Sequence, residues 1–190
     1  LLSTTTASSN TAVGGSSLLA NTTGANNTAV GMNALADNTT ASNNVAVGFC
    51  ASHKITTGTD NVSVGTATLS ENTTGDSNTA VGRKALQNNT TADSNTAVGK
   101  EALKSNTTGN DLVAVGCGAL YNNTTAADNI AVGYQSQYNT TTGHSNVSMG
   151  WQSMVSNTTG AQNTAVGFKS LLANTEGEKN TAVGTCSMCK

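Results

Sequence analysis

The stretch Asn78-Thr-Ala-Val-Gly82-Arg-Lys-Ala-Leu86-Gln-Asn-Asn89-Thr-Thr-Ala-Asp-Ser94 is followed at once by Asn95-Thr-Ala-Val-Gly99. The same five residues therefore return after 17 positions, and Ala-Val-Gly or a close variant returns at this interval along the whole chain. The glycines that close these tripeptides are Gly14, Gly31, Gly48, Gly65, Gly82, Gly99, Gly116, Gly133, Gly150, Gly167 and Gly184. A constant interval without insertion or deletion indicates that each repeat is one structural unit stacked on the last.

Each repeat predicts one strand and one further apolar position. The three residues before the glycine are Thr, Val or Ile, then Ala or Ser, then Val or Met, and this alternation is typical of a strand. The apolar residues four positions after the glycine are Leu18, Leu35, Leu69, Leu86, Leu103, Leu120, Met154, Leu171 and Met188. We expect Val and Leu to form the core, and the small middle residue of the strand to allow close approach of a partner chain.

The rest of the repeat predicts turns. Asn-Thr-Thr is followed by a second glycine, or by Ala at positions 41, 92 and 126. Because the first glycine never varies and the second does, we expect only the first to need a positive φ or a very close backbone neighbour.

These units are too short and too rich in glycine for a stable helix. We therefore predict an all-β fold, a parallel β-solenoid (β-roll) of eleven 17-residue rungs, with residues 1–190 forming one domain. Rungs about 4.8 Å apart would give a rod roughly 50 Å long. The absence of Pro agrees, because every rung must donate backbone N–H groups to its neighbour.

Composition excludes several classes of function. The 190 residues are 36% hydrophobic, but only 3% aromatic and 9% charged, and the formal net charge is −2. A charge so close to zero argues against a nucleic-acid partner, and no apolar run approaches the roughly 20 residues of a membrane helix. Burial of one Val and one Leu per rung is small against the entropy cost of ordering 17 residues, so we expect self-association as a trimer or filament.

Both ends of the chain fall inside a rung. Leu1 is in register with the apolar position and Thr4-Thr5-Thr6-Ala7 with the turn, while Lys190 lies six residues past Gly184. We expect either a segment of a longer array or head-to-tail stacking of copies, because exposed β edges invite pairing.

The repeat resembles the head repeats of trimeric autotransporter adhesins and Asn-Thr-Ala-Val-Gly segments of phage and large-virus fibre proteins. The matching stretches are Asn27–Gly31, Asn78–Gly82, Asn95–Gly99 and Asn163–Gly167. The resemblance implies an extracellular structural protein, commonly trimeric, on a cell or virion surface. The period of 17 is longer than the usual unit of the adhesin head.

Four cysteines require separate interpretations. Cys50 and Cys117 are about four rungs apart, near 19 Å, which is too far for a bridge within the chain. Cys186 and Cys189 have C-x-x-C spacing, which fits structural thiols, a local disulfide, a cross-link between chains or, with less support, half of a metal site.

No group of residues predicts catalysis, a cofactor or a bound metal. His53 and His144 stand on separate rungs without a recurring acidic companion. The recurring acidic residues Asp60, Asp76, Asp93, Asp111 and Asp128 occur singly near one turn. We expect these to be solvated turn residues and the protein not to be an enzyme.

The Asn-Thr-Thr turns are also acceptor sequences for N-glycosylation. The predicted sites are Asn21, Asn38, Asn72, Asn89, Asn106, Asn123 and Asn157. The alternative is an asparagine ladder in which the Thr hydroxyls bind turn backbone.

Aromatic residues follow the glycine directly in three consecutive rungs. Tyr134, Trp151 and Phe168 are expected to stack into a strip that either binds surface glycans or a receptor or simply covers the rod.

The leading hypothesis for function is a fibre, stalk or adhesin head that acts through self-association and surface display. The alternative is a glycan- or receptor-binding module that uses the aromatic strip. Ice binding is a further alternative with less support, because strict Thr-x-Thr strands are scarce.

Overall fold

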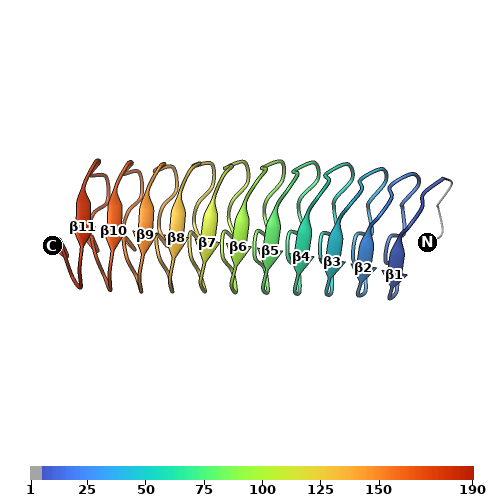
Figure 1. Ribbon diagram of the computed structural model, residues 1–190, viewed down its shortest axis with the longest axis horizontal. Coiled ribbons are helices and arrows are strands. Elements are labelled where there is room, and N and C mark those ends of the chain that lie inside the picture. The colour runs from blue at the N-terminus through green and yellow to red at the C-terminus, as the bar shows by residue number, and fades with distance from the viewer. Residues whose placement is uncertain (1–5) are drawn as a thin grey trace.

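The computed structural model describes residues 6–190 and confirms the predicted parallel β-solenoid. Eleven strands stack in chain order along an elongated rod, with β1 and β11 at opposite ends (Figure 1). They are β1 (Thr11–Val13), β2 (Thr28–Val30), β3 (Val45–Val47), β4 (Val62–Val64), β5 (Thr79–Val81), β6 (Thr96–Val98), β7 (Val113–Val115), β8 (Ile130–Val132), β9 (Val147–Met149), β10 (Thr164–Val166) and β11 (Thr181–Val183). Each strand pairs in parallel with the next at an offset of one repeat, as Thr79 pairs with Thr96. The predicted register of Leu1, Thr4 and Thr5 lies outside the described residues.

The middle residue of each strand points into the coil. Ala80 and Ala97 are fully buried, whereas the residues on either side of them are half-buried or exposed. The expectation that Val fills the core and the small residue faces a partner is therefore wrong. The alternating pattern has the same period on either face of a strand, so it does not say which face is inside. Leucines from the opposite wall occupy the interior and leave room for only a small side chain from the sheet.

The apolar position four residues after the glycine is confirmed as core. Leu86 and Leu103 are fully buried, as are most equivalent residues, although Met188 in the last coil is 50% exposed. Ser52 and Gln137 stand at the same position in two coils. The second of these coincides with a division of the core into a cluster from Leu18 to Ala131 and a smaller one from Met154 to Ala182.

The invariant glycine forms the corner after each strand. Gly82 has a φ of 125°, and a Cβ there would lie 2.7 Å from the carbonyl carbon of Gly99 in the next coil. The predicted need for positive φ and close approach is thus confirmed. The expectation that only the first glycine has a very close neighbour is wrong, because a Cβ on Gly75 would overlap the Ala92 carbonyl oxygen. Ala92 itself occupies that register position, so the second turn does accept a methyl group.

Three further positions in each coil have positive φ, and all the residues described there except Gly118 are not glycine. They are two, four and twelve residues after the corner glycine, as at Lys84 (φ 61°), Leu86 (φ 49°) and Ser94 (φ 60°). This conformation costs roughly 1–2 kcal/mol for an L-residue. Hydrogen bonds to neighbouring coils hold it in place: the Leu86 N–H donates to the Ala102 carbonyl at 3.0 Å.

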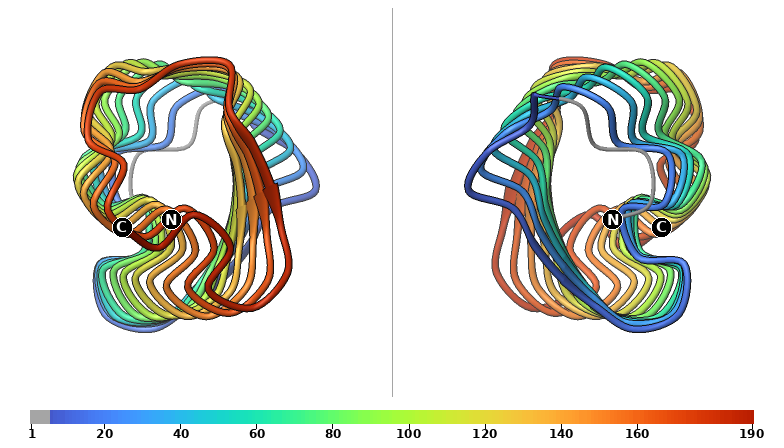
Figure 2. Two further views of the ribbon diagram at one scale, coloured as in Figure 1. Left: turned by 90° about the vertical axis from the view of Figure 1, so that its left-hand side faces the viewer. Right: turned by 90° about the vertical axis from the view of Figure 1, so that its right-hand side faces the viewer.

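Asparagines fill the rest of the interior in two columns, and hydrogen bonds within and between coils engage most of their polar atoms, the Oδ1 atoms of Asn38 and Asn123 being exceptions. In the strand column, which precedes every strand except β7, where Leu112 stands, Asn78 Nδ2 donates to the Ala92 carbonyl at 2.8 Å and Asn78 Oδ1 accepts the Asn95 N–H at 3.1 Å. In the turn column, Asn89 Nδ2 donates to Asn72 Oδ1 and to the Ala92 carbonyl, both at 3.0 Å. Viewed end-on, the coils superimpose with a gradual rotation, so these bonds repeat along the rod (Figure 2).

Candidate binding surfaces

The predicted glycosylation sites belong to the turn column and lie inside the rod. Asn21, Asn38, Asn72, Asn89, Asn106, Asn123 and Asn157 are all fully buried. Their Nδ2 groups donate within the coil, as Asn106 does to the Gly109 carbonyl at 2.9 Å. A glycan on such an atom has no room in this fold, so the structure contradicts these seven sites and favours the asparagine-ladder alternative.

Threonines beside this column behave as that alternative predicts. Thr73 Oγ1 donates to the Thr90 carbonyl at 3.1 Å, and Thr90 Oγ1 donates to the Thr107 carbonyl at 3.0 Å. The acceptor sequence is therefore a structural signature of the turn.

The aromatic strip exists as predicted, with its rings stacked along the rod axis. Tyr134 and Trp151 have centroids 5.8 Å apart and an interplanar angle of 15°, and Trp151 and Phe168 are 5.1 Å apart at 11°. Lys169 Nζ lies 5.1 Å from the centroid of the Trp151 ring. Both faces of Trp151 are thus opposed by other rings, and the strip presents ring edges to solvent.

This geometry bears on carbohydrate recognition. A sugar that stacks on an aromatic residue needs an open ring face, and the central ring offers none in this arrangement. The stacking supports the interpretation of the strip as a covering ladder on the rod.

A second aromatic stack was not predicted. Tyr121 and Tyr138 have centroids 4.9 Å apart at 13°, and Lys104 Nζ donates to the Tyr121 hydroxyl at 2.8 Å. This hydrogen bond raises the pKa of Lys104, while burial raises the pKa of Tyr138. The signal was available in the sequence, because the three residues are spaced by one repeat each.

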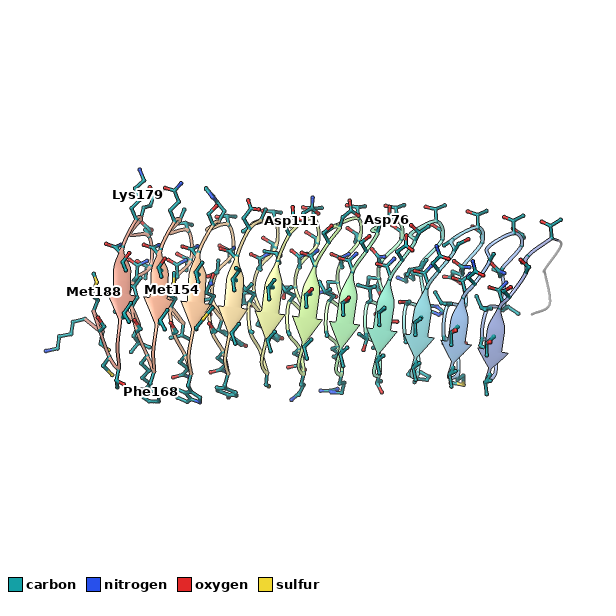
Figure 3. All side chains as sticks on the ribbon, in the orientation of Figure 1. Asp76, Asp111, Met154, Phe168, Lys179 and Met188 are labelled. Atoms are coloured by element: carbon teal, nitrogen blue, oxygen red, sulfur yellow. The ribbon has the colours of Figure 1, made fainter. Side chains whose placement is uncertain are left out.

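Two of the acidic residues near one turn accept hydrogen bonds from the preceding coil. Asp76 Oδ1 accepts the Thr59 N–H at 2.6 Å, and Asp93 Oδ1 accepts the Asp76 N–H at 2.7 Å. Asp76 and Asp111 lie on the side of the rod where the strands begin, and Phe168 lies on the side where they end (Figure 3). Among residues 6–190, no group of three or more His, Cys, Asp or Glu is placed to hold a metal ion.

The two histidines remain apart, on different coils. His53 Nδ1 lies 3.3 Å from the Asn33 carbonyl oxygen and its Nε2 lies 3.9 Å from Asp37 Oδ2, while His144 contacts Ser145. Neither histidine has a nucleophile and an orienting carboxylate arranged around it in these contacts.

All four cysteines are free thiols. Cys189 Sγ donates to the Lys169 carbonyl at 3.1 Å. Its pKa is raised, first by burial and then by a hydrogen bond with the Cys186 side chain. The structure therefore brings the predicted pair together as neighbouring thiols, and the cross-link between chains stays a prediction.

No protein-family model, curated protein or solved structure matches this chain. Within the described coils, no helix has the length and apolar character to cross a membrane.

Proposed function

We propose that this protein is a structural rod, a subunit of a surface fibre or filament whose work is to give length and stiffness and to display itself outside a cell or virion. The observation that carries the proposal is the continuity of bonding between coils. Strand, corner and turn all donate to or accept from the neighbouring coil, as Thr79 N–H donates to the Asn95 carbonyl at 2.8 Å and Lys84 N–H donates to the Thr66 carbonyl at 3.0 Å.

This bonding supports a mechanical role for a physical reason. Bending the rod would stretch a row of backbone hydrogen bonds and, at the same time, separate the buried Asn78 and Asn95 amides from their partners. Breaking several buried hydrogen bonds together is costly, so the coil stack resists bending.

The resemblance to adhesin and viral fibre repeats supports surface display. It rests on the Asn-Thr-Ala-Val-Gly motif at Asn27–Gly31 and its equivalents. The alternative of glycan binding through the strip loses support, because neighbouring rings oppose both faces of Trp151.

Immunolabelling tests the proposed location. An antibody raised against the purified chain should label intact, unpermeabilised cells or particles that carry the protein, while an antibody against an interior protein should not. Labelling that appears only after permeabilisation would contradict surface display.

Small-angle X-ray scattering tests the proposed mechanics on the purified chain. A stiff solenoid should give a rod-like profile with a length on the order of 50 Å per chain and little change over moderate salt concentrations. A profile typical of a flexible coil would contradict the stiff rod.

A further inference from the structure

The outer face of the sheet is an uncharged surface that runs along the rod. It consists of the first and last residues of the strands β1–β11, which are Thr, Val or Ile at the first position and Val or Met at the last. We call this surface the outer sheet face. Val64 and Val98 on it are each 37% exposed and Met149 is 44% exposed, and no residue on it carries a charge.

Its size matches a protein interface. Eleven strands about 4.8 Å apart, each about 10 Å long, make a face of roughly 500 Å². The last residues of the strands form an apolar row along this face, whereas six of the eleven first residues are Thr. Contiguous apolar patches above a few hundred Å² mark interaction sites on soluble proteins. Two such faces together would bury on the order of 1,000 Å², which is the lower limit of the area that a specific interface needs.

The residues of this face are also suited to packing without a large entropy cost. Val, Ile and Thr are stiff at χ1, so little rotamer freedom remains to be lost on association. Two sheets of this kind can pack face to face about 10 Å apart.

Charges on the two borders of the face differ in sign. The upper border in Figure 3, before the strands, carries Asp76 and Asp111 in the middle of the rod and Lys179 near its C-terminal end. Asp60, Asp93 and Asp128 occupy the register positions of these two aspartates, so the middle of this border is acidic. The lower border, after the strands, carries Arg83, Lys84 and Lys100 in the same part of the rod, with Glu101 bound to Arg83 at 3.3 Å. The register position of Lys100 is that of Phe168, which Figure 3 labels on the lower edge.

This asymmetry selects one orientation for a second copy. Two copies that pack through their outer sheet faces can be related by a twofold axis along the rod. This arrangement keeps the two rods parallel and places the acidic border of one copy against the basic border of the other. Rotation about an axis along the strands would reverse one rod and place the acidic borders against each other, because the acidic residues are centred on the middle of the chain. Like charges so placed oppose association.

We infer that the outer sheet face binds a second copy of this chain, with the rods parallel and the symmetry axis along the rod. The inference rests on the proposed fibre function and deepens it, because it identifies which surface of the subunit self-associates and in which orientation.

Native mass measurement with matched variants tests the face. The unmodified chain should form a closed oligomer at micromolar concentration. The double variant Val81→Lys/Val98→Lys should shift it to the mass of one chain, because four or more ammonium groups would meet in the apolar interface. The control Thr74→Lys/Thr91→Lys adds the same charge to exposed positions away from the face and should leave the oligomer intact. Circular dichroism of all three chains checks that each one folds.

Distance measurement between spin labels tests the orientation. With Cys50, Cys117 and Cys189 replaced by Ser, a label on exposed Cys186 near one end of the rod should lie close to its counterpart. An antiparallel pair would instead separate the labels by about the rod length of 50 Å. Reversal of one border charge, Lys100→Glu, should weaken association roughly tenfold, and the added change Asp111→Lys should restore it.

A monomeric unmodified chain, an oligomer that tolerates Val81→Lys/Val98→Lys, or labels one rod length apart would each overturn the inference. A monomer that produces thermal hysteresis would overturn it too and would assign the face to ice. Surface labelling of intact cells by a chain that is monomeric would leave the fibre function standing without this interface, so the two proposals fail separately.

Discussion

At the scale of single residues, the left-handed backbone of the core leucines is the least expected feature. Leu86 has a φ of 49° and is fully buried, and the same conformation recurs in every complete coil described. The positive φ at Gly82 could be inferred from an invariant glycine, because glycine alone adopts it without cost. Leucine carries no such signal. Its conformation is imposed by the hydrogen bonds of the coils on either side, so it could not be predicted from local sequence.

The strained backbone predicts opposite effects for one chemical change at two sites. Ala67 has a φ of 52°, and Gly118 occupies the same register position with a φ of 67°. We expect Ala67→Gly to stabilise the fold by about 0.5–1 kcal/mol, because relief of left-handed strain exceeds the added entropy of the unfolded chain. Ala80→Gly, at a buried strand centre, should destabilise it by about 1 kcal/mol or more. Chemical denaturation measures both, and the same sign for the two variants would refute the argument.

The two glycines of the repeat should also respond differently to a methyl group. Gly82→Ala should cost about 3 kcal/mol or more, since φ is 125° and the new Cβ would meet the Gly99 backbone at 2.7 Å. Gly75→Ala should cost less, about 1–2 kcal/mol: its Cβ would also overlap backbone, but its φ is outside the left-handed region, and Ala41, Ala92 and Ala126 show that this turn can shift to accept a methyl group. Thermal unfolding of the two variants makes the comparison, and equal losses would contradict it.

At the scale of the structural element, the asparagine columns organise the turns. The sequence allowed two interpretations of Asn-Thr-Thr, glycan acceptors or a ladder, because the same motif serves both. Only the position of Asn89 and Asn106 inside the coil separates them. The column also shows what an interruption does: where Ile55 replaces the asparagine, the buried Oδ1 of Asn38 has no hydrogen-bond partner.

Adjacent asparagines allow a controlled test of the ladder. Asn89→Ile should destabilise the fold by about 2–4 kcal/mol, because it removes the bonds to Asn72 and to the Ala92 carbonyl and leaves the Asn106 amide short of an acceptor. Asn88→Ile changes an exposed neighbour and should alter stability by less than about 0.5 kcal/mol. Urea denaturation distinguishes the two, and a small effect at Asn89 would show that the ladder contributes little.

The positions of the strands could be predicted from the sequence, but which face of each strand lies inside the coil could not. The triplet Thr79–Val81 and its equivalents fall where the alternation indicated, yet Ala80 points inward and Val81 outward. Periodicity fixes the spacing of the two faces, while the choice between them depends on the width of the coil and on the leucines opposite. The outer sheet face was missed for this reason.

At the scale of the whole molecule, one polar residue divides the core. Gln137 occupies a leucine position, donates from Nε2 to the Ile130 carbonyl at 2.9 Å and leaves its buried Oε1 without a partner. Nearby, Ser136 and Ser148 pair through their hydroxyls. The apolar core is continuous on the N-terminal side of this region and resumes at Met154. Because solenoid coils contact only their neighbours, such a position weakens the coupling between the two parts.

Replacement of this residue should therefore strengthen the rod as a whole. We expect Gln137→Leu to stabilise it by about 1–3 kcal/mol, since it removes a buried unpaired carbonyl and restores the residue found in most coils. Hydrogen exchange should show the coils after Gln137 opening before the rest in the unmodified chain and together with the rest in the variant. Uniform opening in the unmodified chain would contradict a divided core.

The similar interfaces between successive coils also have a consequence for how the length of the protein can change in evolution. Each coil receives hydrogen bonds from the one before it and offers the same set to the one after it, so removal or duplication of a whole repeat rejoins compatible surfaces. Recombination between gene segments that encode successive repeats would then lengthen or shorten the protein in steps of about 4.8 Å without creating an unstable junction. The length of the rod can thus change in evolution through the number of repeats alone.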